Sequence, residues 1–125
     1  MRFVLVDTDI FIEVLRGRNP ELARKWIALL EAGTLLFYSP ITAAELIHGI
    51  EDAERPDLLL RFEQMTCAPL DMEVGIQAGN YLQRYHLSHN VELPDSLIAA
   101  TAAVHGMLLW TRNRKHFPMS DVSFF

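Results

Sequence analysis

The most constraining feature of the chain is an unbroken apolar run, Phe3–Val6, that ends directly at an aspartate, Asp7. A short continuous apolar run with β-branched members predicts a strand buried on both faces, as in a parallel sheet covered by helices. The remaining chain must therefore supply helices for two faces of a sheet. The aspartate marks the point where the buried strand ends.

Strand and helix patterns alternate along the rest of the chain. Leu35–Tyr38 and residues 107–110 predict two further strands, and residues 122–125 could add a short last one. Residues 67–70 predict a short strand at a sheet edge, because a proline cannot donate to the ladder. Apolar residues at helical spacing fill the intervals. This alternation predicts an α/β fold with three layers, α/β/α, around a mostly parallel central sheet.

Prolines and polar residues mark where the helices begin and end. The pair Asn19-Pro20 predicts a capped helix start, because asparagine caps well and proline fits the first turn. We expect a helix to begin near Thr42, a polar loop over residues 87–93, and an alanine-rich helix that opens at Pro94-Asp95.

Length and composition limit the class of protein. The 125 residues predict one domain, 1–125, and half of them are hydrophobic, enough for a core. Asp and Glu number 16 against 11 Lys and Arg, so any contact with nucleic acid must be local. The single cysteine, Cys67, excludes an internal disulfide and a cysteine-based zinc site. The first apolar run is too short for a signal peptide or a membrane span, so we expect a cytoplasmic protein.

Three carboxylates are placed to meet at one edge of the predicted sheet. Asp7 follows the first strand, whereas Glu45 and Asp95 lie in the first turns of helices that should start on the same edge. Carboxylates that converge repel one another unless a cation neutralises them. Oxygen ligands alone suit Mg²⁺ or Mn²⁺ rather than zinc. Such an ion can activate water and hold a phosphodiester, so the pattern predicts metal-assisted phosphodiester hydrolysis.

Each acid also has a structural interpretation. Thr42 and Glu45 have the spacing of a capping box, so Glu45 could simply cap a helix. Asp95 could be a first-turn acid favoured by the helix dipole. Asp9 is interpreted as a capping or supporting group rather than a ligand. Asp7 is the hardest of the four to explain structurally, because it terminates a buried strand.

Basic residues and histidines follow the same edge. Arg112, Arg114 and Lys115 come after the last strand and could hold flanking RNA phosphates, although the run could equally be a solvated loop. The spacing of His86 and His89 would suit a metal pair. Without cysteines or a third histidine nearby, a surface position is favoured for both.

Four segments of the chain carry a family resemblance. Residues 4–10, 39–49, 94–102 and 109–117 resemble, in order, the four successive motifs of the PIN domain. The resemblance covers essentially the whole chain with ordinary spacing. The length and single-domain build are similar to those of VapC toxins in particular.

This resemblance implies an endoribonuclease that uses Mg²⁺ or Mn²⁺ and acts as the toxin of a VapBC toxin–antitoxin module. It also implies inhibition by a cognate VapB antitoxin and assembly as a homodimer. By the match, Asp7, Glu45 and Asp95 would be the catalytic metal carboxylates. Thr8 and Thr111 would support the site through their hydroxyls.

The fourth motif departs from the family pattern. Relatives often carry an acid where this chain has Asn113 or His116, and either residue could still bind the metal or a bridging water. The departure leaves open a weakly active or inactive module that mainly binds its antitoxin and RNA. A second alternative is a haloacid-dehalogenase-like phosphatase with Asp7 as nucleophile, although Phe11 stands where such enzymes usually carry Thr or Val.

Overall fold

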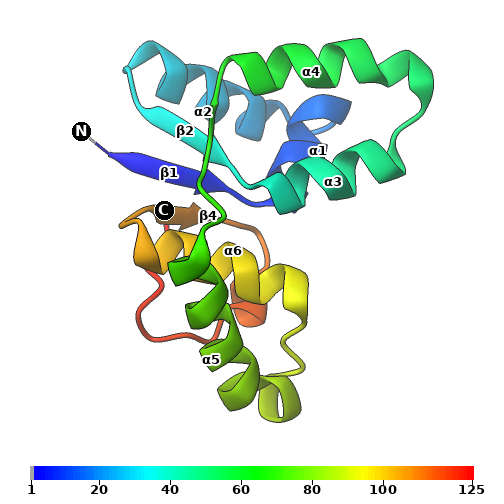
Figure 1. Cartoon of the computed structure of the whole chain (residues 1–125). Helices are drawn as coiled ribbons and strands as arrows, with labels where there is room; N and C mark the ends of the chain where they lie inside the picture. Colours follow the sequence, from blue (N-terminus) through cyan, green and yellow to red (C-terminus); the bar gives the residue numbers. More distant parts are fainter. Residues whose placement is uncertain (1) are drawn as a thin grey trace.

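The computed structural model describes residues 2–125 and shows a parallel sheet with helices on both faces (Figure 1). The strands are β1 (Phe3–Val6), β2 (Leu35–Tyr38), β3 (Thr66–Cys67) and β4 (Leu108–Trp110). The α-helices are α1 (Thr8–Arg16), α2 (Pro20–Glu31), α3 (Pro40–Gly49), α4 (Arg55–Glu63), α5 (Met72–His89) and α6 (Leu93–Val104). Two short 3₁₀ helices are η1 (Asp52–Glu54) and η2 (Arg114–His116). The predicted three-layer α/β/α class is confirmed.

The sheet has the strand order β3-β2-β1-β4, and every neighbouring pair is parallel. β1 therefore lies in the interior of the sheet, and β3 lies at an edge, as predicted for residues 67–70 from Pro69. The predicted strand at 122–125 is reduced to a single bridge between Leu109 and Phe124. Since all strands run the same way, their carboxyl ends, with Asp7 and Thr111, share one edge of the sheet.

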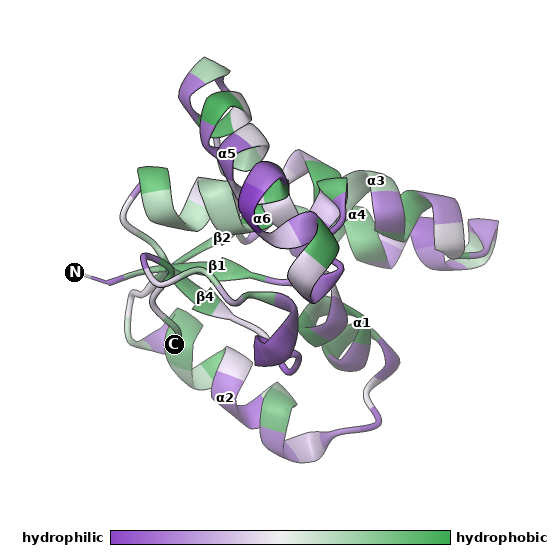
Figure 2. Cartoon of the chain, turned by 90° about the horizontal axis from the view of Figure 1, so that it is seen from below, coloured by the Kyte–Doolittle hydropathy of each residue, from purple (hydrophilic) through white to green (hydrophobic). Residues whose placement is uncertain are grey.

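β1 is buried on both faces, as its continuous apolar run predicted. Val4 and Val6 pack into one cluster beneath α1 to α4, with Trp26 and Phe11 among its largest members. Leu5 points to the other face and joins the cluster under α5 and α6. Figure 2 shows the hydrophobic strands between these two helical layers. The two cores hold β1 rigidly, so the residue that follows it has a fixed position.

Two predicted helix boundaries were wrong. α3 begins at Pro40 rather than near Thr42, because Ser39 accepts a hydrogen bond from the backbone of Ile41 and caps the helix two residues earlier. α5 continues to His89 and α6 begins at Leu93, so only residues 90–92 of the predicted loop over 87–93 are non-helical. α5 ends where Asn90 adopts a left-handed conformation.

Within residues 2–125, the helices are too short or too polar for any of them to cross a bilayer.

Candidate active site

Asp7 is the centre of the site. It follows β1, it is only 7 % exposed, and its backbone N–H donates to the carbonyl of Trp110 at the end of β4. One carboxylate oxygen caps α1 by accepting from the backbone of Thr8 at 2.8 Å. The other accepts from the hydroxyl of Thr111, also at 2.8 Å. The two oxygens are therefore oriented by the first residue of α1 and by the residue that follows β4.

Glu45 reaches the same edge from α3. The hydroxyl of Thr8 lies 2.9 Å from the Glu45 carboxylate and 2.9 Å from the hydroxyl of Thr42, which is fully buried. The capping-box interpretation of Glu45 was wrong, because Ser39 caps α3 and Glu45 falls in the second turn. Its exposed carboxylate is thus not used to cap the start of α3, and it accepts instead from the hydroxyl of Thr8, which also contacts Thr42.

Asp95 lies in the first turn of α6, as predicted. Its carboxylate is partly buried and lies 3.7 Å from the imidazole Nδ1 of His116, which follows β4. His116 therefore touches a candidate ligand, although its own side chain is half exposed. The contact ties η2 to the start of α6.

Asp9, predicted to be a capping or supporting group, contacts the loop that follows β4. Its Oδ2 accepts from the backbone N–H of Arg112 at 3.0 Å and from the side-chain amide of Asn113 at 3.4 Å. The backbone N–H of Asn113 donates in turn to Thr111. Asp9 thereby fastens the loop after β4 to α1. The Asp-x-Asp spacing at the end of β1 was the signal that could have assigned this contact.

The acids of this edge influence one another electrostatically. Burial, followed by the charge of Asp9, raises the pKa of Asp7 from 3.8 to about 7. The hydrogen bonds from Thr111 and Thr8 lower this pKa, and the charge of Asp95 makes a smaller contribution that raises it. Burial also raises the pKa of Asp95; the charge of His116 lowers that pKa, whereas Glu45 and Asp9 raise it. The charges of Asp7, Asp9, Glu45 and Asp95 therefore act on one another at this edge of the sheet.

The donor set suits a hard divalent cation. In the described chain, no Lys, Arg or His lies within 4 Å of the Asp7 carboxylate, so a buried acid lacks a cationic partner. No three Asp, Glu, His or Cys side chains of residues 2–125 converge into a ready-made metal cage. Mg²⁺ does not require such a cage, because it keeps several waters and binds through one or two carboxylates.

The three residues predicted to bind phosphate differ in how far their charged groups already contact other parts of the chain. The guanidinium of Arg112 lies 3.8 Å from Glu13, and that of Arg114 donates to the main-chain oxygen of Phe125 and covers the ring of Phe124. Lys115 has no carboxylate within 4 Å among the residues described. Lys115 is therefore the most available cation of the three.

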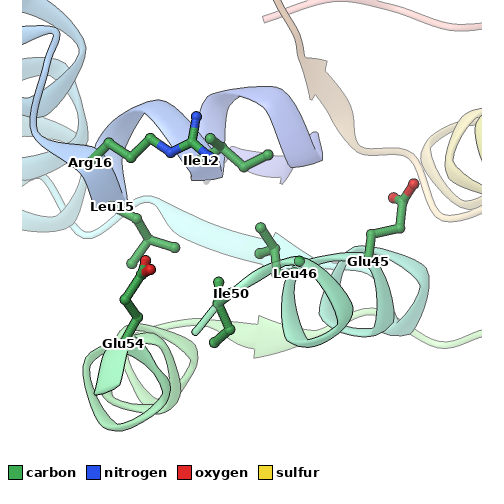
Figure 3. A pocket seen from close by; sticks show the side chains of 8 residues that line it. Ile12, Leu15, Arg16, Glu45, Leu46, Ile50 and Glu54 are labelled. Carbon is green, nitrogen blue, oxygen red and sulfur yellow. The ribbon is translucent and has the colours of Figure 1, made fainter. Parts of the chain in front are cut away.

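An apolar groove begins beside Glu45. It lies between α1 and α3, has a volume of about 130 Å³, and Figure 3 shows Glu45 at one end and Glu54 at the other. The side chains between these acids are largely aliphatic: Ile12, Leu15, Leu46 and Ile50. The groove thus joins an apolar surface to the acidic edge.

Comparison with known proteins defines the family. The family model described as PIN domain matches residues 4–122. The chain belongs to the PIN-domain family. It is 38 % identical over 119 residues to Ribonuclease VapC10 of Mycobacterium tuberculosis, covering 94 % of this chain and 88 % of that protein. The predicted family is therefore confirmed, and membership excludes the phosphatase alternative.

Solved structures agree with the PIN fold. The chain superposes on VapBC2 of Rickettsia felis with a TM-score of 0.83 at 17 % identity, covering 98 % of this chain and 97 % of that one. It also resembles a toxin–antitoxin complex from Klebsiella pneumoniae, with a TM-score of 0.76, 25 % identity, and coverage of 95 % and 94 %. The PIN sheet and its acidic edge are thus embedded in a fold shared with toxin–antitoxin proteins.

Proposed function

We propose that this protein is a metal-dependent endoribonuclease that acts as the toxin of a VapBC-type toxin–antitoxin module. The observation that carries the proposal is Asp7, a buried carboxylate with a raised pKa and no cationic side chain beside it. A buried charge without a partner is costly, and a bound cation removes that cost. Similarity to a ribonuclease of the PIN family gives the reaction class.

Asp7, Glu45 and Asp95 are the residues that would hold Mg²⁺ or Mn²⁺. When bound, such an ion lowers the pKa of a coordinated water and neutralises charge on the scissile phosphate. The chain's own part is positioning: Thr111 and the first turn of α1 orient Asp7, and Thr8 orients Glu45. His116 acts beside Asp95 as a helper rather than as an essential ligand.

The groove between α1 and α3 is where a protein inhibitor would fit. Its aliphatic lining favours apolar side chains, and the acids at its two ends, Glu45 and Glu54, favour lysine or arginine. A segment with this pattern would reach the metal edge and exclude RNA. The resemblance to toxin–antitoxin proteins supports a VapB-type antitoxin as that partner. We further propose that the protein forms a homodimer and acts in the cytoplasm.

An expression test addresses the toxin role. Induction of the wild-type chain in bacteria should arrest growth and fragment RNA, whereas Asp7→Asn at equal soluble expression should do neither. Coexpression of a cognate VapB-type antitoxin should restore growth to cells that express the wild type. Normal growth of cells that accumulate folded wild-type protein without an antitoxin would contradict the toxin role.

A weakly active or inactive binding module is the second candidate. It is favoured by the fourth motif, where the family resemblance leads us to expect an acid and this chain has Asn113 or His116. Under this candidate the wild type would bind RNA and the antitoxin without cutting RNA in either metal. The first candidate requires cleavage that depends on Asp7.

A further inference from the structure

A second hollow, separate from the groove at Glu45, adjoins the acidic site at Asp95. It has a volume of about 370 Å³ and opens between the turn joining α5 to α6 and the 3₁₀ helix η2. All the residues that line it carry a polar or charged group: His89, Asn90, Glu92, Asp95, Lys115 and His116. Because Asp95 and His116 belong to both, the hollow is continuous with the catalytic edge. The absence of aliphatic lining distinguishes it from the groove that suits a protein segment.

Asn90 has a backbone conformation that glycine would adopt more easily. It ends α5 with φ 54° and ψ 35°, the one non-glycine residue of the described chain with positive φ. Asparagine tolerates this region, but glycine is the usual residue at such helix ends. The Asn90 amide makes no hydrogen bond within residues 2–125. The position therefore retains a side chain that the turn itself does not need.

The other lining groups suit a nucleotide. The Lys115 ammonium has no carboxylate within 4 Å in the described chain, so it is free to neutralise a phosphate. His89 and His116 are exposed rings, and nucleobases of single-stranded RNA stack on such rings. Glu92, exposed at the start of α6, can accept a hydrogen bond from the exocyclic amine of a base.

We propose that this hollow is a nucleotide subsite that binds one residue of single-stranded RNA adjacent to the phosphodiester that is cut. Lys115 holds the phosphate of this nucleotide, and the ring of His89 or His116 stacks on its base. Asn90 and Glu92 contact the edge of the base. The Glu92 carboxylate makes the subsite prefer cytosine, which offers an amine, over uracil, which offers a carbonyl at the same position. This inference rests on the proposed ribonuclease function and names where its substrate binds.

The test measures RNA binding apart from cleavage. Fluorescence anisotropy in Mg²⁺ follows binding of fluorescein-labelled hexacytidylate and hexauridylate to Asp7→Asn protein, which keeps the RNA intact. In that background we expect Asn90→Gly and Lys115→Gln each to weaken binding at least 5-fold. Asn90→Gly is informative because glycine keeps the left-handed turn and removes only the amide. Arg24→Gln, the same charge change on exposed α2, is the matched control and should leave affinity unchanged.

The base preference gives a second readout. The Asp7→Asn parent should bind hexacytidylate about 5-fold more tightly than hexauridylate, and Glu92→Gln should abolish that difference. Equal affinities for Asn90→Gly, Lys115→Gln and Arg24→Gln would overturn the subsite. So would variants that weaken antitoxin binding while RNA binding is unchanged, since the hollow would then be a protein interface. Wild-type cleavage is scored separately: RNA binding that depends on Asn90 without any cleavage would refute the ribonuclease and retain the subsite.

Discussion

Replacing Asp7 by asparagine should make the metal-free protein more stable at neutral pH. The carboxylate is 7 % exposed, and its pKa in the folded protein is about 7 against an ordinary value of 3.8. A folded-state pKa above the unfolded value means that ionisation weakens the fold. The loss of stability therefore develops as pH rises from about 4 to 7 and is complete above 7.

The size of this effect follows from the pKa. A rise from 3.8 to about 7 corresponds to roughly 4 kcal/mol of destabilisation by the ionised group. Asparagine removes the charge and can still cap α1, but the Thr111 hydroxyl loses its carboxylate acceptor, at a cost of about 1–2 kcal/mol. The net gain for Asp7→Asn at pH 8 is then about 2 kcal/mol. For 125 residues this raises the melting temperature by about 8 °C.

The assay is thermal and urea unfolding from pH 4 to 8 in EDTA. Wild-type stability should fall across that range more steeply than that of Asp7→Asn. Asp71→Asn is the matched control, because Asp71 also caps a helix, α5, but is exposed. It should change stability by less than about 1 kcal/mol, since asparagine and aspartate cap equally well. A destabilised Asp7→Asn at pH 8, or parallel pH profiles for it and the wild type, would refute the reasoning.

Three further predictions follow from the same contacts. Saturating Mg²⁺ or Mn²⁺, at 100 times its Kd, should stabilise the wild type by about 3 kcal/mol and Asp7→Asn much less; equal shifts in calorimetry would count against a site at Asp7. Thr8→Val should slow RNA cleavage at least 10-fold by releasing Glu45, and Thr8→Ser should restore most of it; equal rates for both variants would make the hydroxyl irrelevant. His116→Ala should slow cleavage without abolishing it, more in Mn²⁺ than in Mg²⁺, whereas His116→Asp should retain activity and use Mg²⁺ better; wild-type rates for His116→Ala in both metals would make it a bystander.

The parts of the site set by local sequence could be predicted. β1 and Asp7 are contiguous in sequence. The apolar run therefore predicted the strand, and the acid directly after it predicted the site residue. Asp95 was correctly predicted in the first turn of a helix, because Pro94 indicates a helix start whatever the helix packs against. The shared edge followed from parallel strands, which need no knowledge of side-chain contacts.

The contacts between distant segments could not be predicted. Thr8 and Glu45 are 37 residues apart, and Asp9 and Arg112 are 103 apart, so only the packing of α1 against α3 and β4 brings them together. The start of α3 was misplaced because the capping-box spacing of Thr42 and Glu45 was followed, whereas the structure uses Ser39 as the cap. Thr42 is fully buried inside the helix and Ser39 is the cap. Burial depends on the whole fold, so the local sequence could not show it.

Cleavage of RNA by purified protein tests the central claim most directly. Single-stranded RNA is incubated with the wild type and with Asp7→Asn, Glu45→Gln and Asp95→Asn, each purified identically and shown to be folded by circular dichroism. The account predicts cleavage by the wild type in Mg²⁺ or Mn²⁺, loss of it in EDTA, and loss of at least 100-fold in each variant, as expected when a group essential to the chemistry is removed. Cleavage that persists in EDTA, or at wild-type rates in folded Asp7→Asn, would contradict it.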